Sequence, residues 1–598
     1  MRKRKTKEED RLIRVLQSLG VYESSDIECL RDDIERQIIQ SEINRIIDAN
    51  PEIAESYTNK DRGIKSSVEV DQWYDGGTNQ EDINKAILRV GTNANKETHK
   101  ESKAKKVIKA FISEGYFGYL KLRKLIGKPL EHPVLRPWYA GELVRIPSLV
   151  NPGGKVTLLE GTYTLSGKIQ AKSNLVLEGN GWQNTRLLMA TSSYAIDLSN
   201  YDNITIRELE IDGNNRAYGP ERVISGNGCN DITVERIFMH DHGSEYGVEI
   251  WNGDRIRVQD SKFTRIGQSG DSDPVSIQQC NYVWVVGNTV YDSVYEYRAG
   301  AIEVQDGGGI VIVADNEIHK SQVGIVVSSH GYDTTSPIKR AVVGFNHVEV
   351  YNVDEHSGKY QAGIWMGGNG NYGAGGARAI VGNVIKVNCM AGDHGINSWN
   401  TGIRVYNHVE DVTIIGNIVD CAAFQQERGN ACISIHYVND IDKRIIVSSN
   451  ILLNAYQAGI LIENGNEQEI VISNNICYGC EKGIHIKDGD YIFIEGNNLR
   501  GNTTAITVES GKNTHGWIRN NPGYNPVGVS SISVGSSPFT YTAGSSPETV
   551  YIRGGTVSDI SVDGTTLFTD SGHSIDLEPH QSVTVTYTDA PTMVKYVH

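Results

Sequence analysis

The chain has 598 residues, of which 22% are charged, and a formal net charge of −16. This composition is that of folded protein rather than of a disordered chain. Its acidic balance argues against nucleic acid or an anionic membrane surface as the main partner, because both repel negative charge.

No apolar run is long enough for a transmembrane helix, so membrane insertion is not expected. The start, "MRKRKTKEEDRL", is basic but lacks the apolar stretch of a secretory signal, so ordinary secretion is not expected either. The eight cysteines are scattered rather than spaced as a disulfide framework. The one CxxC pair, Cys477 and Cys480, is predicted to consist of packed turn residues rather than a zinc or redox site.

Residues 1–65 predict a helical segment. The stretches "EEDRLIRVLQSLG" and "RDDIERQIIQSEINRIIDAN" carry apolar residues at i, i+3, i+4 and i+7, the pattern of amphipathic helices. Two interpretations stay open: a cap over the end of the following domain, or a segment for attachment or trimerisation.

Two stretches mark where a new domain begins: "WYDGGTNQEDINKAILRV" (73–90) and "GGKVTLLEGTYTLSGKIQAKSNLVLEGNGW" (153–182). They resemble the start of pectate-lyase-superfamily proteins, in which a D-G-x-x-N motif and a capping helix precede the first β-helix rung. The resemblance spans roughly 66–520. The chain departs from the family by a Lys-rich insertion at about 91–128, which predicts a helical hairpin of unknown purpose. Residues 66–150 are therefore assigned to the entry of the β-helix, with the capping helix and this insertion.

The strongest signal between residues 151 and 520 is a repeat. An apolar burst ends in the same slot once per period, with steps from 22 residues (475 to 497) to 37 residues (346 to 383). Recurrence at this spacing is the signature of a solenoid. The slot is held by Asn180, Leu209, Ile237, Ser261, Asn288, Asn316, Asn346, Asn383, Asn417, Asn450, Asn475 and Asn497.

A second burst follows in each period, as in "AGAIEVQ", "VGIVVS", "AGIWMG" and "TGIRVY". Alternating apolar residues predict short strands, and the Gly before them suits a tight corner. A leucine-rich consensus is absent, and a propeller would need about four strands per blade. We therefore predict a mainly β chain with a right-handed parallel β-helix, a single-stranded solenoid, over 151–520. The Asn slot predicts a structural ladder of side-chain amides along its axis.

From 521 to 598 the period disappears, and short alternating strands with Ser, Thr and Gly turns predict a small β-sandwich. It resembles small modules at the ends of phage and archaeal-virus surface proteins. With the helical head and the β-helix, the whole chain resembles a viral tailspike or tail fibre. That resemblance implies a homotrimer in the virion, outside the cell, which binds a host surface polysaccharide, attaches to tail or capsid proteins through its N-terminal segment and leaves by lysis.

Candidate site residues are those that alternate outward in the second bursts. Glu249 and Glu303 lie two rungs apart, roughly 9–10 Å at the usual strand spacing, with the small Ser276 between. This is close to the carboxyl separation of inverting glycosidases, about 6.5–9.5 Å. Asp273 and Asp306, with Asp271, lie in the flanking turns. Scattered acids also serve solubility alone, and that interpretation stays open. The predicted substrate-binding residues are Trp251, Gln278, Tyr297 with Tyr295 beside it, Gln305, Trp365, Arg404, Tyr406 and His436.

The leading hypothesis is a virion tailspike that cuts a polysaccharide by hydrolysis, with Glu303 as general acid and Glu249 as base, or the reverse. Aromatic rings would stack on sugars, and Arg404 and His436 would bind acidic or hydroxyl groups. The alternatives are a fibre that binds without cutting, and a polysaccharide lyase or C5-epimerase using Tyr406 and His436. The calcium cluster of pectate lyases and the "NTD", "DD" and "RIK" signatures of polygalacturonases are not recognisable, and no metal or cofactor is expected.

Overall fold

A computed structural model describes residues 134–135, 143, 154–191, 194–215, 222–267, 273–293, 300–329, 338–351, 362–368, 377–388, 400–406, 409, 411–421, 431–438, 444–465 and 469–598. The helices predicted in 1–65, the capping helix predicted in 73–90 and the Lys-rich insertion at about 91–128 lie outside these residues. Within the described part, no helix is long and apolar enough to cross a membrane.

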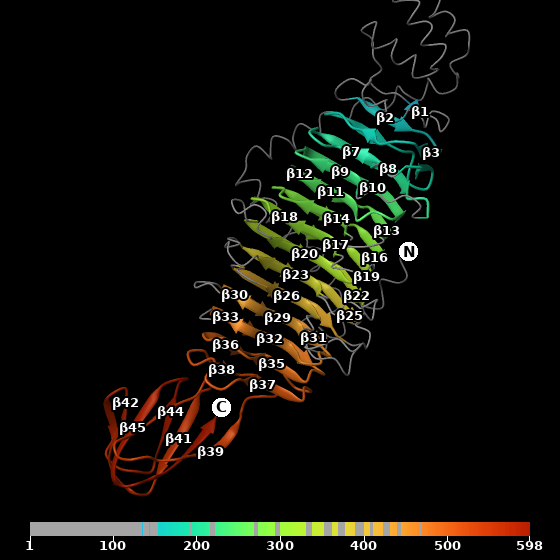
Figure 1. The fold of residues 1–598 in the computed structure, drawn as a ribbon. Coiled ribbons are helices and arrows are strands. Elements are labelled where there is room, and N and C mark those ends of the chain that lie inside the picture. Colours follow the sequence, from blue (N-terminus) through green and yellow to red (C-terminus); the bar gives the residue numbers. More distant parts are fainter. Residues whose placement is uncertain are drawn as a thin grey trace, which may run out of the picture. The chain divides into compact units, whose positions relative to one another are not determined.

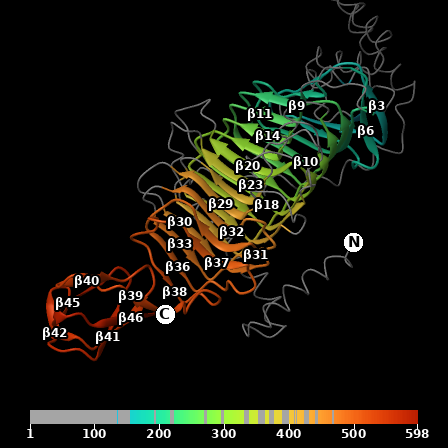
Figure 2. The ribbon, with the colours of Figure 1, turned by 60° about the horizontal axis from the view of Figure 1, so that its bottom comes forward.

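The solenoid consists of parallel strands stacked in three columns (Figures 1 and 2), and a complete rung contributes one strand to each column in turn. The first column comprises β1 (Val134–Leu135), β2 (Lys155–Leu158), β5 (Val176–Glu178), β8 (Ile204–Asp212), β10 (Asn230–His242), β12 (Asp254–Gln259), β15 (Val283–Val286), β18 (Ile310–Ala314), β21 (Arg340–Gly344), β24 (Arg378–Val381), β27 (Val412–Ile415), β30 (Arg444–Ser448), β33 (Glu469–Ser473), β36 (Ile492–Glu495) and β38 (Ile518–Arg519).

The second column comprises β3 (Gly161–Leu165), β6 (Thr185–Met189), the last residues of β8 and β10, β13 (Lys262–Ile266), β16 (Thr289–Ser293), β19 (Glu317–Ser321), β22 (His347–Tyr351), β25 (Val384–Asn388), β28 (Ile418–Asp420), β31 (Ile451–Leu453) and β34 (Ile476–Tyr478). The third comprises β4 (Ile169–Gln170), β7 (Ile196–Asp197), β9 (Arg222–Asn227), β11 (Tyr246–Trp251), β14 (Asp273–Gln278), β17 (Gly300–Gln305), β20 (Val323–Ser329), β23 (Ala362–Gly368), β26 (Thr401–Tyr406), β29 (Ala431–Val438), β32 (Ala458–Gly465), β35 (Lys482–Ile486) and β37 (Thr504–Val508). The predicted parallel β-helix is confirmed.

The core fills the inside of the three columns. Every second residue of a strand points inward, and the parallel register stacks like on like, as with Ile256 on Val283 and Val283 on Val311. These side chains are at most 1% exposed and belong to one continuous apolar cluster. A single rung could not bury such a cluster, so the repeat itself creates the core. Cys477 and Cys480 also belong to this cluster, as packed residues.

The predicted asparagine ladder is confirmed from Asn288 onward and extends one rung further, to Asn521. In each step the Nδ2 of one asparagine donates to the Oδ1 of the next, at 2.9 to 3.1 Å, and every member is at most 1% exposed. The backbone N–H of Ser261 starts the series by donating to Asn288 Oδ1 at 3.1 Å. The prediction is wrong at Asn180, which is exposed and whose backbone N–H donates to Thr185 Oγ1 instead.

The glycines near the start of the third-column strands serve close approach rather than a tight corner. Gly363 and Gly402 are the second residues of β23 and β26. A Cβ on Gly402 would collide with the Val419 side chain and lie 2.7 Å from the carbonyl oxygen of Cys432 on the next rung. A Cβ on Gly363 would lie 2.7 Å from the carbonyl oxygen of Gly402. Glycine is therefore required by packing between rungs at these positions.

After the last rung, two four-stranded antiparallel sheets share a separate apolar cluster that includes Val550, Ile560 and Val585. Ser546 Oγ donates to the carbonyl oxygen of Ile518 on β38 at 2.7 Å. The sheets are β39 (Gly528–Ile532), β46 (Thr592–Val597), β41 (Glu548–Arg553) and β44 (His573–Leu577), and β40 (Phe539–Thr542), β45 (Ser582–Asp589), β42 (Thr556–Val562) and β43 (Thr565–Phe568).

Candidate functional site

The outer face of the third column carries two rows of side chains in register, because Val248 and Ile250 of β11 and their counterparts on the other strands point into the core. The first row is Ser225, Glu249, Ser276, Glu303, Val326, Trp365, Arg404, Ser434, Leu461 and His485. The second row is Asn227, Trp251, Gln278, Gln305, Ser328, Gly367, Tyr406, His436 and Glu463.

Glu249 faces outward from β11, but its side chain is only 1% exposed. The carboxylate forms an ion pair with Arg222 of β9, and the Arg222 guanidinium lies 5.8 Å from the centre of the Trp251 ring. Among the described residues, Glu249 Oε1 and Trp251 Nε1 have no hydrogen-bond partner. A buried carboxylate oxygen without a partner is costly, and the ion pair between the other oxygen and Arg222 offsets part of that cost.

Glu303 of β17 is half-buried and accepts a hydrogen bond from Gln305 Nε2. It lies two rungs from Glu249, with Ser276 between them in the row. The two predicted aspartates are buried more deeply than Glu303. Asp273 begins β14, is buried, and accepts a hydrogen bond from the Gly300 backbone N–H at 2.7 Å. Asp306 follows β17, is also buried, and has a left-handed backbone with φ of 53°.

Trp365 and Arg404 of the first row form a chain of contacts with Tyr406 and His436 of the second row across three rungs. The Arg404 guanidinium lies 5.1 Å from the centre of the Trp365 ring and 4.4 Å from that of Tyr406. The Trp365 and Tyr406 rings meet edge to face at 6.2 Å, and the Tyr406 ring stacks on His436 at 5.7 Å. Arg404 is 2% exposed, whereas the three rings are half-buried. Of the other predicted binding residues, Gln278 donates to Ser276 Oγ, and Tyr297 lies outside the described residues.

Glu463 and Lys487 extend these contacts, although neither is among the site residues predicted from the sequence. Glu463 Oε2 lies 2.9 Å from His436 Nδ1, and Lys487 contacts Glu463 Oε1. Burial alone would raise the pKa of Glu463, but the contacts with His436 and Lys487 outweigh it and lower the pKa to about 2. The signal in the sequence is the second-burst position of Glu463 in "AGILIENG", one period after His436.

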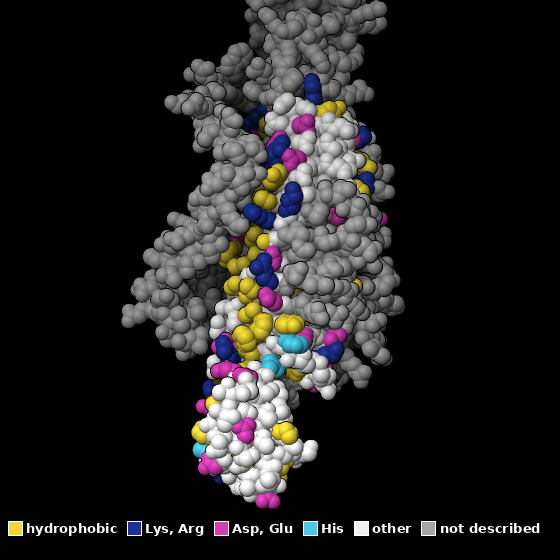
Figure 3. Space-filling view, turned by 90° about the vertical axis from the view of Figure 1, so that its left-hand side faces the viewer, with side chains coloured by type: hydrophobic (Ala, Val, Ile, Leu, Met, Phe, Trp, Pro, Cys, Tyr) yellow, Lys and Arg dark blue, Asp and Glu magenta, His cyan; other side chains and the backbone are white. Residues whose placement is uncertain are grey.

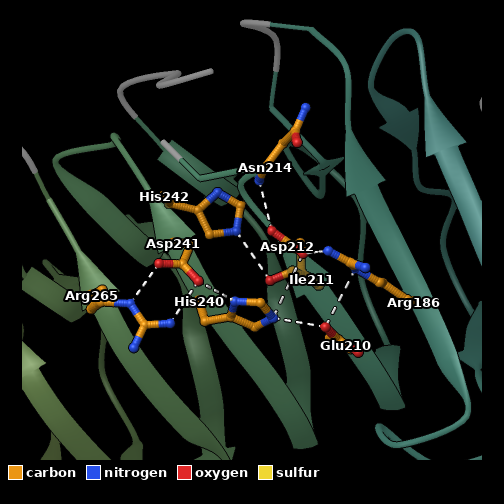
Figure 4. A network of polar contacts seen from close by, with 9 residues as sticks. All are labelled: Arg186, Glu210, Ile211, Asp212, Asn214, His240, Asp241, His242 and Arg265. Carbon is orange, nitrogen blue, oxygen red and sulfur yellow. Dashed lines mark hydrogen bonds and ion pairs between the residues drawn. The ribbon is translucent and has the colours of Figure 1, made fainter. Parts of the chain in front are cut away.

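A polar network lies on the outer face of the second column and was not predicted from the sequence (Figure 4). His240 Nδ1 lies 2.8 Å from Asp241 Oδ2, and its Nε2 lies 2.7 Å from Glu210 Oε1. Arg186 contacts both Glu210 and Asp212. The available signal was the alternation of polar residues in "LEID" and "FMHDH", one period apart.

The network also includes Arg265 of β13 and His242 of β10. Arg265 donates two hydrogen bonds to Asp241, which together with His240 keep the pKa of that carboxyl well below its usual range despite its partial burial. Burial lowers the pKa of the neighbouring His242 to about 4, and its Nε2 lies 3.2 Å from the carbonyl oxygen of Ile211.

Residues 168–336 match the family model described as "right handed beta helix region". The A-module of mannuronan C-5 epimerase AlgE6 from Azotobacter vinelandii is 12% identical, with a TM-score of 0.40, and the match covers 66% of this chain and 97% of that chain. A mutant tailspike protein of Escherichia coli bacteriophage HK620 is 13% identical, with a TM-score of 0.46, covering 79% and 91%. Another mutant of that tailspike, in complex with a pentasaccharide, is 13% identical, with a TM-score of 0.44, covering 79% and 92%. No curated protein matches the chain.

Proposed function

We propose that the chain binds an extended polysaccharide along the outer face of the third column. The observation that carries this proposal is the set of contacts among Trp365, Arg404, Tyr406 and His436. Aromatic faces stack on the C–H surfaces of sugars. The guanidinium and imidazole beside them supply hydrogen-bond donors for hydroxyl or carboxylate groups. Because strands repeat at about 4.8 Å, these side chains offer successive contacts to a linear polymer.

We further propose that the chain cuts this polymer by hydrolysis at Glu249 and Glu303. Glu249, which is held by its ion pair with Arg222, would act as the general base. Glu249 would take a proton from a water molecule as the water oxygen bonds to the anomeric carbon. Glu303 would give a proton to the departing glycosidic oxygen as the bond between that oxygen and the anomeric carbon breaks. The small Ser276 between them leaves room for the water.

A second candidate activity is a lyase or C5-epimerase reaction on an acidic polysaccharide. The contact between His436 and Glu463 favours it, because a carboxylate orients the imidazole as a base beside the stacked Tyr406 ring. Arg404 would then neutralise the uronate carboxylate. The third candidate is a fibre that binds without cutting.

We propose that the working form is a homotrimeric tailspike or tail fibre of a virion. Support for assembly comes from the outer face of the first column, where hydrophobic side chains gather in a stripe (Figure 3). The row in register includes Trp284, Ile312, Val342, Ile446 and Val471. Ile446 and Val471 are 39% and 37% exposed, and an exposed apolar stripe of this kind is a surface that other copies of the chain could cover.

In this assembly, residues 1–65 would be the helical segment that attaches to tail or capsid proteins. The two antiparallel sheets within 521–598 would form a terminal β-sandwich. Mass measurement of the purified chain tests the assembly. A trimer supports the tailspike proposal, and a monomer at working concentration argues against it.

The test of activity is incubation of the purified chain with bacterial surface polysaccharides, following fragment size and the ultraviolet absorbance of unsaturated products. Shorter chains without new absorbance support hydrolysis, and Glu249→Gln and Glu303→Gln should then each abolish cleavage. The matched control is Glu481→Gln, an exposed glutamate in a turn of the solenoid, which should cut normally. New absorbance would indicate a lyase, with Tyr406 and His436 as the catalytic residues. Binding without shortening would indicate a fibre that binds the polysaccharide without cutting it.

Binding is tested separately from cleavage. Arg404→Ala and Trp365→Ala should each weaken polysaccharide binding at least about tenfold, since each removes a cation–aromatic contact near the ligand. The result that would contradict the binding site is unchanged affinity in both variants, checked by circular dichroism to be folded.

A further inference from the structure

A cluster of histidine and glutamate side chains lies on the outer face of the second column, away from the proposed polysaccharide face. Glu317 and His319 are on β19, and His347 and Glu349 are on β22 of the next rung. One ligand atom from each of Glu317, His319 and His347 lies within 4.8 Å of the others. All three are open to solvent, with side-chain exposures of 57%, 23% and 35% respectively.

We propose that Glu317, His319 and His347 bind a zinc-like transition-metal ion. Two imidazole nitrogens and one carboxylate oxygen form a ligand set that zinc uses in proteins, with a fourth position left for water. Magnesium and calcium prefer oxygen ligands throughout, so this set selects against them. The ion would join strands of two adjacent rungs, since Glu317 lies directly opposite His347 in the register.

Glu349 orients the central ligand. Both ring nitrogens of His319 face carboxylates, with Nε2 3.0 Å from Glu317 Oε1 and Nδ1 3.3 Å from Glu349 Oε2. A neutral imidazole has only one N–H, so it can donate to one of the two. Donation from Nδ1 to Glu349 leaves the Nε2 lone pair directed at Glu317, where a cation would be stabilised by both. A carboxylate that fixes the tautomer of a ligating histidine is the usual arrangement around protein-bound metals.

The network of Figure 4 provides an internal comparison. Glu210, Asp212 and His240 bring the same kinds of ligand atoms equally close together. There, however, Arg186 already contacts both carboxylates and occupies the place of a cation. Within the described part of the chain, Glu317, His319 and His347 have no arginine contact. The nearby Lys386 Nζ lies 3.8 Å from Glu349, which is not one of the proposed ligands.

The test uses the full chain after chelation and desalting. Calorimetric titration with zinc chloride should give one site per chain, and cobalt chloride should give a visible absorption band. Metal bound only by the folded state should also raise the unfolding temperature. Magnesium and calcium chloride should do none of these.

His319→Ala and His347→Ala should each weaken zinc binding at least about tenfold, because even loss of an orienting residue costs 10- to 100-fold. Glu349→Gln should weaken it less. His240→Ala, in the arginine-closed network, is the matched control and should bind zinc as the parent chain does. Because the two histidines are partly exposed, circular dichroism should find both variants folded. The proposal is overturned if no zinc binds, if the double variant His319→Ala/His347→Ala binds unchanged, or if calcium binds equally well.

Discussion

Replacing Asn417 by alanine removes one step of the amide ladder at its middle. The Asn417 side chain accepts hydrogen bonds from the backbone N–H and the Nδ2 of Asn383, at 3.0 and 2.9 Å. Its own Nδ2 donates to the carbonyl oxygen of Ile380 and to Asn450 Oδ1, both at 2.9 Å. The substitution therefore deletes these four bonds inside a region from which water is excluded, since Asn383, Asn417 and Asn450 are 0% exposed.

The cost is dominated by the two donors of Asn383 that lose their acceptor. The Asn450 oxygen keeps the backbone N–H of Asn417, at 3.0 Å, and so remains satisfied. A buried donor without a partner costs about 1–3 kcal/mol. With two such donors on Asn383, we expect Asn417→Ala to lower the free energy of unfolding by about 2–6 kcal/mol.

Urea unfolding followed by circular dichroism measures this change, with the slope against urea compared between variants. Where unfolding is not reversible, the unfolding rate at fixed urea takes its place. Asn180→Ala is the matched control. Asn180 shares the sequence slot but is exposed and outside the ladder, so its replacement should change stability by less than about 0.5 kcal/mol. If the two variants are equally stable, the ladder does not hold the rungs together as reasoned.

Two further predictions concern packing and charge. Gly402→Ala should destabilise the solenoid by at least about 1–3 kcal/mol, because the added methyl group collides with Val419. Gly344→Ala should be tolerated, because the nearest neighbour of its added Cβ would lie at 3.4 Å. Thermal unfolding compares the two variants, and equal melting temperatures would contradict the close-approach argument. Glu463 has a folded pKa of about 2, below its ordinary 4.5, so its ion pairs stabilise the fold above pH 4.5 and this contribution is lost as pH falls towards 2. Glu463→Gln should therefore flatten the pH dependence of stability between these values, and an unchanged acid-unfolding profile would argue against the contact with His436.

The succession of rungs could be predicted from the sequence because every rung of a β-helix imposes the same requirements on its residues. An inward position must be apolar on every rung, and the amide slot must offer both a donor and an acceptor, so both leave a periodic trace. Asn180 was misjudged because the slot only becomes a ladder where successive rungs all carry a side chain that can bond, and Leu209 and Ile237 interrupt it. Sequence spacing alone does not say where such a chain of bonds begins.

The candidate site could be predicted from the sequence only in part. Strand alternation placed Glu249 and Arg404 outward, as found, but it could not say that both side chains are nearly fully buried. Nor could it find Arg222 beside Glu249, because the partner belongs to the preceding rung and rung lengths vary. The pairing of His240 with Glu210 was hidden for the same reason, since contacts between rungs depend on register.

Register also governs which charges can share a row. Two like charges on adjacent rungs, at about 4.8 Å, would repel by about 3.5 kcal/mol at an effective dielectric constant of 20, and two rungs apart by about half of that. On the second column, Arg186 stacks on Glu210, so opposite charges meet. On the third column, Glu249 and Glu303 are separated by Ser276. The intervening serine therefore keeps two carboxylates on one face from standing on adjacent rungs, where their repulsion would be strongest.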